Sequence, residues 1–325
     1  MRLFAIIAVF TTAILGILCE PSIYDVAVGL FKNNSSKKSV LLPQIHIIRL
    51  PKACSSSLSM VARRMVGCYP PGPCCRWPGD PPGSCPAKGL FECELQKKVI
   101  GCTHHHPNYN VLKDPNIFSL TFMRNPISRA ISAYGYGSIH YNSKCGQIDS
   151  PMCIKAYIHS NAFRNIAVKL FTGQYAYADI PTCRNTSTCP NSFELAISNI
   201  HHFRVIGLAE LWSVSLLLLH SVFPGLEPLH YEFTIGSNAT GSDQHGNVAK
   251  GLRIQSGKGD SSKSRMLLPY IQEIRQSNEL DMELYSAVVD LLCKELISHN
   301  LWQYATVQRE WRDKFQSKSR DGGCQ

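Results

Sequence analysis

Short apolar runs alternate along this chain with longer segments in which apolar residues recur at helical spacing. Three of the runs are predicted to be buried strands, and they are Gln44–Leu50, Ile117–Met123 and Phe203–Leu208. The segments that follow them are predicted to be helices, and they are Leu58–Val66, Pro126–Tyr134 and Glu210–Val222. Strands that alternate with helices predict a largely parallel sheet with helices on both faces. The pattern therefore predicts an α/β fold.

The last part of the chain continues with a loop, a helix and a tail. Gly236–Ser264 is rich in Gly, Ser and Lys and is predicted to be a loop. Asp281–His299 carries an apolar stripe at helical spacing, which predicts an amphipathic helix. The charged residues 306–325 are predicted to be a tail. Residues 44–305 then form one domain, which is large enough to bury a full core.

The first residues predict a membrane anchor. Arg2 is followed by an uncharged and mostly apolar run, Leu3–Cys19. A positive charge before such a run indicates a type II signal anchor over residues 1–19, and a signal peptide cleaved near Cys19 is the alternative. Residues 20–43 are polar and predict a short stem. Glycosylation sequons agree with a lumenal location, and they begin at Asn33, Asn34, Asn185 and Asn238.

Cysteine usage also indicates an oxidising compartment, because the chain has 14 cysteines in 325 residues. Six of them lie in the Pro- and Gly-rich segment 68–102, which is predicted to be an insert closed by disulfides. Their pairing cannot be read from the sequence. Two short-range disulfides are predicted, Cys145–Cys153 and Cys183–Cys189.

The net charge of +10 favours polyanionic partners such as nucleotides, acidic glycans or membrane headgroups. No interleaved aromatic and basic platform occurs along the chain, and a lumenal protein meets no nucleic acid, so nucleic-acid binding is not expected.

A loop of small residues separates the first predicted strand from the helix after it. A strand–loop–helix turn directs backbone N–H groups and the positive end of the helix at one point, which makes an anion site. The serine hydroxyls add donors and the lysine adds a point charge. The G-x-x-x-x-G-K-[ST] pattern of ATP- and GTP-hydrolysing loops is absent. The candidate anion-binding residues are Pro51, Lys52, Ala53, Cys54, Ser55, Ser56 and Ser57.

A second candidate anion element follows the next predicted strand. Arg124 stands at the strand end, Asn125 and Pro126 suit the cap and first position of a helix, and Ser132 lies about two turns into that helix. A guanidinium and a hydroxyl placed in this way can converge on one phosphate.

The two elements together resemble the nucleotide-binding motifs of the membrane-bound carbohydrate sulfotransferases. The first resembles their 5′-phosphosulfate loop, Pro-Lys-x-x-Ser-[ST]-Ser, and the second their 3′-phosphate motif, Arg-[Asn/Asp]-Pro-x-x-Arg-x-x-Ser, including the interval of eight residues from Arg124 to Ser132. Val205–Glu210 and Asn278–Tyr285 are similar to later family segments, although Ala209 replaces the common Thr.

The resemblance implies a three-layer, P-loop-like fold in which a central parallel sheet is flanked by helices. It also implies 3′-phosphoadenosine-5′-phosphosulfate as co-substrate, with no metal required. By position, Lys52 would neutralise charge on the leaving phosphate, Ser55, Ser56 and Ser57 would bind the 5′-phosphate, and Arg124 and Ser132 the 3′-phosphate.

The acceptor hydroxyl must lose a proton, which requires a general base. His104, His105 and His106 lie between the two motifs, and one of them, with His105 as first choice, is the predicted base. Solvated histidines or a zinc site are the alternatives for this triplet. Reserve bases are Glu92, Glu94 and Glu232, and a hydrolase that pairs Cys54 with a histidine is a further alternative.

The sequence therefore predicts a Golgi-membrane enzyme with a lumenal catalytic domain, or a secreted one if the leader is cleaved. It would transfer a sulfuryl group by in-line displacement to a glycan hydroxyl, with an acidic polysaccharide as one acceptor class. A tyrosine-directed protein sulfotransferase is the second hypothesis. A non-catalytic lumenal protein that binds nucleotide or glycan is the third.

Overall fold

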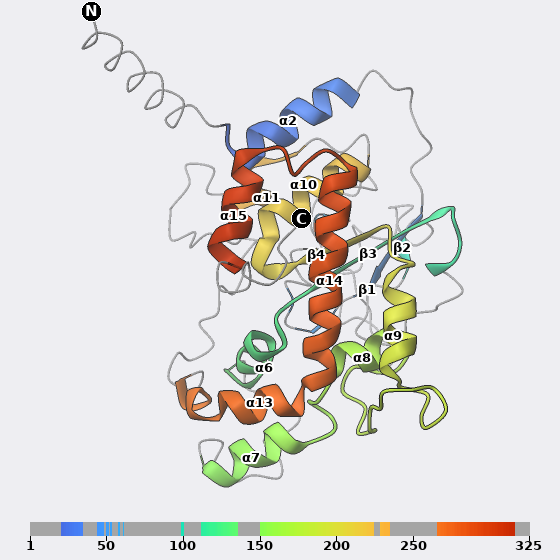
Figure 1. The fold of residues 1–325 in the computed structure, drawn as a ribbon, viewed down its shortest axis with the longest axis vertical. Helices are drawn as coiled ribbons and strands as arrows, with labels where there is room; N and C mark the ends of the chain where they lie inside the picture. The colour runs from blue at the N-terminus through green and yellow to red at the C-terminus, as the bar shows by residue number, and fades with distance from the viewer. Residues whose placement is uncertain are drawn as a thin grey trace, which may run out of the picture.

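The computed structural model describes residues 21–34, 44–48, 50, 51, 53, 58, 61, 99–100, 112–135, 150–223, 228–234 and 265–315 (Figure 1). Its centre is a parallel sheet in which four described strands follow the order β2-β1-β3-β4. The strands are β1 (Gln44–Ile48), β2 (Val99–Ile100), β3 (Ile117–Met123) and β4 (Val205–Leu208). The predicted α/β class with a parallel sheet is confirmed.

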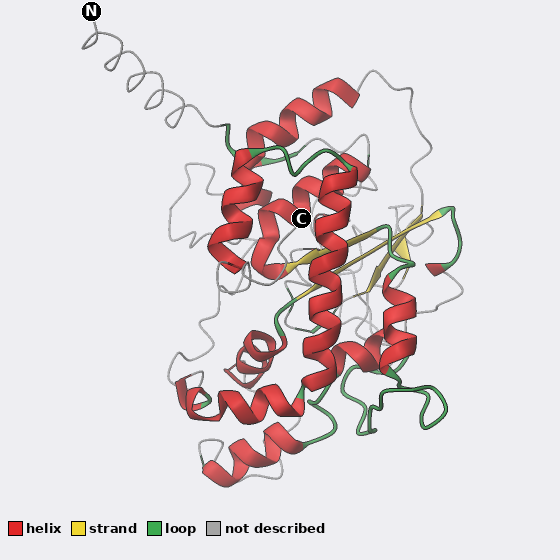
Figure 2. Ribbon diagram, viewed as in Figure 1, coloured by secondary structure: helices red, strands yellow, loops and turns green. Residues whose placement is uncertain are grey.

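Helices flank this sheet (Figure 2). The described helices are α2 (Ile23–Asn34), α6 (Pro126–Gly135), α7 (Pro151–His159), α8 (Ile166–Phe171), α9 (Phe193–Ile200), α10 (Trp212–Val222), α11 (His230–Thr234), α13 (Ile271–Ser277), α14 (Glu279–Ser298) and α15 (Ala305–Phe315), with 3₁₀ turns η1 (Ala209–Leu211) and η2 (Leu268–Tyr270). The long helix α14 runs past the sheet, from α7 and α13 at one end of the molecule to α2, α11 and α15 at the other (Figure 1).

The three predicted strands form close to their predicted bounds because apolar side chains predominate in each run. All seven residues of β3 are buried, as expected for the middle of a covered parallel sheet. Helix α10 is apolar on almost every side and is buried along most of its length. It lies tightly on β4, where a Cβ at Gly207 would come within 2.7 Å of Phe122 and Ser215. Glycine at this position therefore permits the close contact of helix and sheet.

Two segments differ from the sequence-based expectation. Residues 20–43, predicted to be a stem, contain α2, which begins with a capping box in which Ser22 Oγ accepts from the Asp25 N–H at 3.1 Å and the Asp25 carboxylate accepts from the Ser22 N–H at 3.0 Å. Val26 and Ala27 on this helix are buried in the main core. The predicted tail 306–325 contains most of α15, whose Val307 and Trp311 join the same core.

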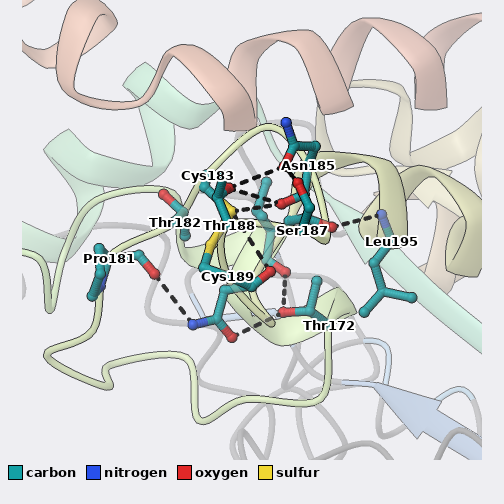
Figure 3. Close-up of a disulfide and its surroundings, with 12 residues drawn as sticks. Thr172, Pro181, Thr182, Cys183, Asn185, Ser187, Thr188, Cys189 and Leu195 are labelled. Carbon is teal, nitrogen blue, oxygen red and sulfur yellow. Dashed lines mark hydrogen bonds between the residues drawn. A yellow bond between two sulfur atoms is a disulfide. The ribbon is translucent and has the colours of Figure 1, made fainter.

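The predicted Cys183–Cys189 disulfide is confirmed (Figure 3). It closes a turn in which Asn185 Oδ1 accepts hydrogen bonds from the hydroxyls of Ser187 and Thr188, at 2.7 and 3.1 Å. Cys153 is also disulfide-bonded. Its predicted partner, Cys145, lies outside the described residues.

Within the described ranges, none of the helices has both the length and the apolar character that a bilayer crossing requires. The predicted anchor over residues 1–19 lies outside those ranges, as does the loop 236–264. The insert 68–102 also lies outside them, except for β2.

Candidate functional site

Three neighbouring strands end at one edge of the sheet. Strands β1 and β3 pair in parallel with Ile48 opposite Thr121, and β3 pairs with β4 with Met123 opposite Leu208. The Thr121 hydroxyl donates a hydrogen bond to the Ile48 carbonyl at 2.9 Å and so ties two of the ends together. The segments that follow β1, β3 and β4 therefore begin side by side, at the edge where ligands bind in open α/β sheets.

The candidate phosphosulfate loop follows β1. Leu50, Pro51 and Ala53 are buried, and the Ala53 N–H donates to the Leu50 carbonyl at 3.2 Å, so the chain turns sharply as it leaves the strand. Leu58 and Val61 are helical and buried. The other predicted residues of this loop, Lys52, Cys54, Ser55, Ser56 and Ser57, lie outside the described residues.

The candidate 3′-phosphate element follows β3 and has the predicted local structure. Asn125 caps α6, because its Oδ1 accepts from the Ile127 and Ser128 N–H groups at 3.1 and 3.3 Å, and Pro126 is the first helical residue. Arg124 is half-buried at the strand end, and Ser132 is half-buried on α6. The cap and the helix start are confirmed; the phosphate contacts remain a prediction.

Glu210 braces this element from the end of β4. Its Oε1 accepts from the Asn125 N–H at 2.9 Å, and its Oε2 accepts from the Tyr285 hydroxyl at 3.2 Å. Burial, followed by the charge of Glu210, raises the pKa of Tyr285, so the phenol remains a donor at neutral pH. One carboxylate thus connects the start of α6 to α14. The sequence analysis used Glu210 only as part of the family-like segment Val205–Glu210. Its position just after the end of a predicted strand was the signal that could have identified it as a site residue.

A buried polar network holds the inner side of α6. Arg129 is 1% exposed, and its Nη2 donates to Asn278 Oδ1 at 3.1 Å and lies 3.8 Å from the Asp281 carboxylate. The Asn278 Oδ1 also accepts from the Asn165 N–H, and the Asn165 Oδ1 accepts from the Asp281 N–H, both at 3.1 Å. The network joins α6, the residue before α8, and the start of α14.

Asp281 is the anion of this network. Its two carboxylate oxygens accept from the Ala167 and Val168 N–H groups at 3.1 and 2.9 Å, at the first turn of α8. Burial raises the pKa of Asp281, whereas Arg129 and these backbone donors act in the opposite direction. Burial also lowers the pKa of the nearby Lys169 to about 8. We regard the pairing with Arg129 and the two amides as the reason that a wholly buried carboxylate is tolerated.

Of the candidate bases, the structure describes only Glu232. His104, His105 and His106 lie outside the described residues, as do Glu92 and Glu94. Glu232 is wholly buried, and its Oε2 lies 3.2 Å from His220 Nε2 and accepts from the Leu229 N–H at 3.2 Å. This reserve base is therefore enclosed in the core between α10 and α11, where an acceptor has no access. In the described part of the chain, no three His, Cys, Asp or Glu side chains are grouped to bind a metal.

No protein-family model matches the chain, and no curated protein matches it significantly. The class that the fold defines is an α/β protein with a parallel sheet and a candidate anion site at the carboxyl ends of β1 and β3.

Proposed function

We propose that the chain is a sulfotransferase that moves the sulfuryl group of 3′-phosphoadenosine-5′-phosphosulfate to a hydroxyl group. The observation that carries this proposal is the parallel pairing of β1 with β3, because the two candidate phosphate elements directly follow these strands. In the proposed arrangement the nucleotide lies across the strand ends of a P-loop-like, three-layer domain of the carbohydrate sulfotransferase family. The capped start of α6 and the buried turn at Leu50–Ala53 support it.

Each part of the site has a chemical task in the proposed reaction. The acceptor oxygen attacks sulfur in line, the bond from sulfur to the bridging oxygen breaks, and adenosine 3′,5′-bisphosphate leaves. Lys52 meets the charge that develops on the bridging oxygen, and the loop amides with Ser55, Ser56 and Ser57 hold the 5′-phosphate. Arg124 and Ser132 hold the 3′-phosphate. One of His104, His105 or His106 takes the acceptor proton.

The proposed acceptor is a glycan hydroxyl in the Golgi lumen. The family resemblance, the net charge of +10, the sequons and the number of cysteines support this setting. Exposed Asn185 lies in a turn closed by a disulfide, which suits a lumenal glycoprotein. Tyrosine in a protein is the second candidate acceptor, and the same residues would transfer the sulfuryl group to its hydroxyl.

Replacing Arg124 by alanine is expected to weaken binding of adenosine 3′,5′-bisphosphate by about 10- to 100-fold, because a charge-assisted contact to the 3′-phosphate is lost. Binding is measured by calorimetry, with transfer of labelled sulfate to a panel of desulfated glycans and tyrosine peptides in parallel. Arg204→Ala is the matched control, since this exposed arginine precedes β4 at the opposite end of the sheet and donates to the Pro115 carbonyl.

Equal affinity in the Arg124 and Arg204 variants would contradict the 3′-phosphate assignment. Binding by the wild-type protein without transfer to any glycan or peptide would favour a non-catalytic nucleotide-binding protein. Full activity of His104→Ala, His105→Ala and His106→Ala, each tested singly, would remove the proposed base and leave the nucleotide site standing.

A further inference from the structure

The turn closed by the Cys183–Cys189 disulfide carries a glycosylation sequon, Asn185-Thr186-Ser187. The other three sequons each include residues outside the described ranges. Residues 184–188 are all exposed, so the amide of Asn185 can be reached from solvent. Access of this kind is what attachment of a bulky, hydrated glycan to an asparagine requires.

The Asn185 side chain is held by its oxygen and not by its nitrogen. Its Oδ1 accepts from the Ser187 and Thr188 hydroxyls at 2.7 and 3.1 Å (Figure 3). Its Nδ2 has no hydrogen-bond partner in the described part of the chain. The acceptor oxygen is therefore satisfied within the turn, and the nitrogen that would carry a sugar is left to solvent.

Two neighbouring asparagines show the opposite arrangement. Asn165 and Asn191 are buried. The Nδ2 of Asn165 donates to the Thr182 hydroxyl at 2.8 Å, and the Nδ2 of Asn191 donates to the Pro181 carbonyl at 3.2 Å. A substituent on either nitrogen would break a buried hydrogen bond. A sugar on Asn185 breaks none, so the folded turn can accommodate it.

The folded turn is nevertheless a poor acceptor for the transfer itself. The Thr188 N–H and hydroxyl both donate to the Asn185 carbonyl, at 3.4 and 3.0 Å, and the disulfide closes the segment around them. A transferase would have to open this turn to bind the sequon in its own cleft. The two hydroxyls on Asn185 Oδ1 also polarise the amide and draw electron density away from Nδ2, which makes the nitrogen less nucleophilic. The open segment is therefore the better acceptor.

We propose that Asn185 is N-glycosylated and that the sugar is added before the Cys183–Cys189 disulfide closes. The donor is an oligosaccharide linked through pyrophosphate to a lipid. A bond forms between Asn185 Nδ2 and the anomeric carbon of the first sugar, and Nδ2 loses one proton. The bond from that carbon to the pyrophosphate oxygen breaks, and the lipid pyrophosphate leaves with the bonding electrons. The proposal rests on the proposed lumenal location and is independent of sulfuryl transfer.

Asn185→Gln and Ser187→Ala, made separately in the full chain, are each expected to abolish an N-linked glycan at this site. The chain is produced in a eukaryotic secretory pathway, and the peptide that contains residue 185 is analysed by mass spectrometry before and after treatment with peptide N-glycosidase. Ser187→Thr keeps the sequon and should keep the glycan. Thr188→Ala is the matched control, because it removes the other hydroxyl on Asn185 Oδ1 but lies outside the sequon, and it should also keep the glycan. An unmodified Asn185 in the disulfide-bonded wild-type chain, or a glycan that persists in Ser187→Ala, overturns the assignment.

The order of the two events is tested with the double variant Cys183→Ser, Cys189→Ser, in which the segment stays open. The fraction of chains that carry the glycan at Asn185 is expected to equal or exceed that of the wild type. A smaller fraction would mean that the closed turn is the acceptor, and the proposed order would be wrong.

Glycan mapping and nucleotide binding separate this proposal from the proposed function. A glycan at Asn185 in a chain that does not bind adenosine 3′,5′-bisphosphate leaves the modification standing while the sulfotransferase proposal fails. Binding of the bisphosphate by a chain with unmodified Asn185 gives the reverse result.

Discussion

Replacing Lys52 by alanine is expected to slow sulfuryl transfer by about 10²- to 10³-fold, because the charge that develops on the leaving phosphate loses its cation. Binding of adenosine 3′,5′-bisphosphate should weaken much less, since in the proposed site the nucleotide is also held by the hydroxyls and amides of the loop and by Arg124. The measurement is the single-turnover rate with saturating labelled donor, alongside a binding isotherm for the bisphosphate. This split separates a role in the transition state from a role in binding.

Lys113→Ala is the matched control, because Lys113 is an exposed lysine in the turn that precedes β3. Its single-turnover rate should equal that of the wild type. Lys52→Arg keeps the charge in a wider and flatter group and should recover part of the rate. A Lys52→Ala protein that turns over at the wild-type rate would show that the leaving phosphate is neutralised elsewhere and that the proposed mechanism is wrong.

Asp281→Ala is expected to destabilise the fold by about 3–5 kcal/mol, because the buried Arg129 loses its counter-ion. The same change removes the acceptor of the Ala167 and Val168 N–H groups at the start of α8. A loss of this size is a large part of the total stability of a typical domain, roughly 5–15 kcal/mol. The free energy of unfolding, measured by urea titration with intact disulfides, should fall accordingly.

Asp290→Ala supplies the comparison on the same helix, since Asp290 is exposed on α14 and should change the free energy of unfolding by less than about 0.5 kcal/mol. Asp281→Asn keeps an acceptor for one of the two backbone amides and should lie between the alanine variant and the wild type. The structural role assigned to the network is untenable if Asp281→Ala unfolds at the same urea concentration as Asp290→Ala.

The sheet was the most predictable part of the molecule. The run Ile117–Met123 is apolar enough to be buried on both faces, and β3 has these same bounds. Asn125-Pro126 marks the start of α6 unambiguously, because a capping side chain precedes a residue that fits only the first turn. Both features can be predicted because they depend only on neighbouring residues and not on partners elsewhere in the chain.

Helix α2 was missed although its pattern was visible. Its apolar residues Ile23, Val26, Ala27 and Leu30 recur at helical spacing after Ser22, which forms a capping box with Asp25. The surrounding Ser, Asn and Lys residues suggested a stem instead. Short helices such as α8 were not predictable, since Ile166–Phe171 is only six residues long and is held by Asp281, more than 100 residues away.

The candidate site was predictable where it depends on neighbouring strands, and not where it depends on distant partners. Arg124 and Ser132 could be assigned from one segment. The brace at Glu210 and the contacts of Arg129 could not, because Tyr285, Asn278 and Asp281 come from the last fifth of the chain. Periodicity carries no information on which buried polar groups will meet across such separations.

The link from Arg129 to Asn278 spans 149 positions of sequence. During synthesis, α6 therefore leaves the ribosome long before the residues that fix its inner side. Domains form as their segments emerge, at roughly 5–20 residues per second, so this wait is on the order of ten seconds or more. A nascent chain arrested before α14 is expected to lack Asp281, the counter-ion of Arg129 on α6, so the proposed nucleotide site would become competent only near the end of translation.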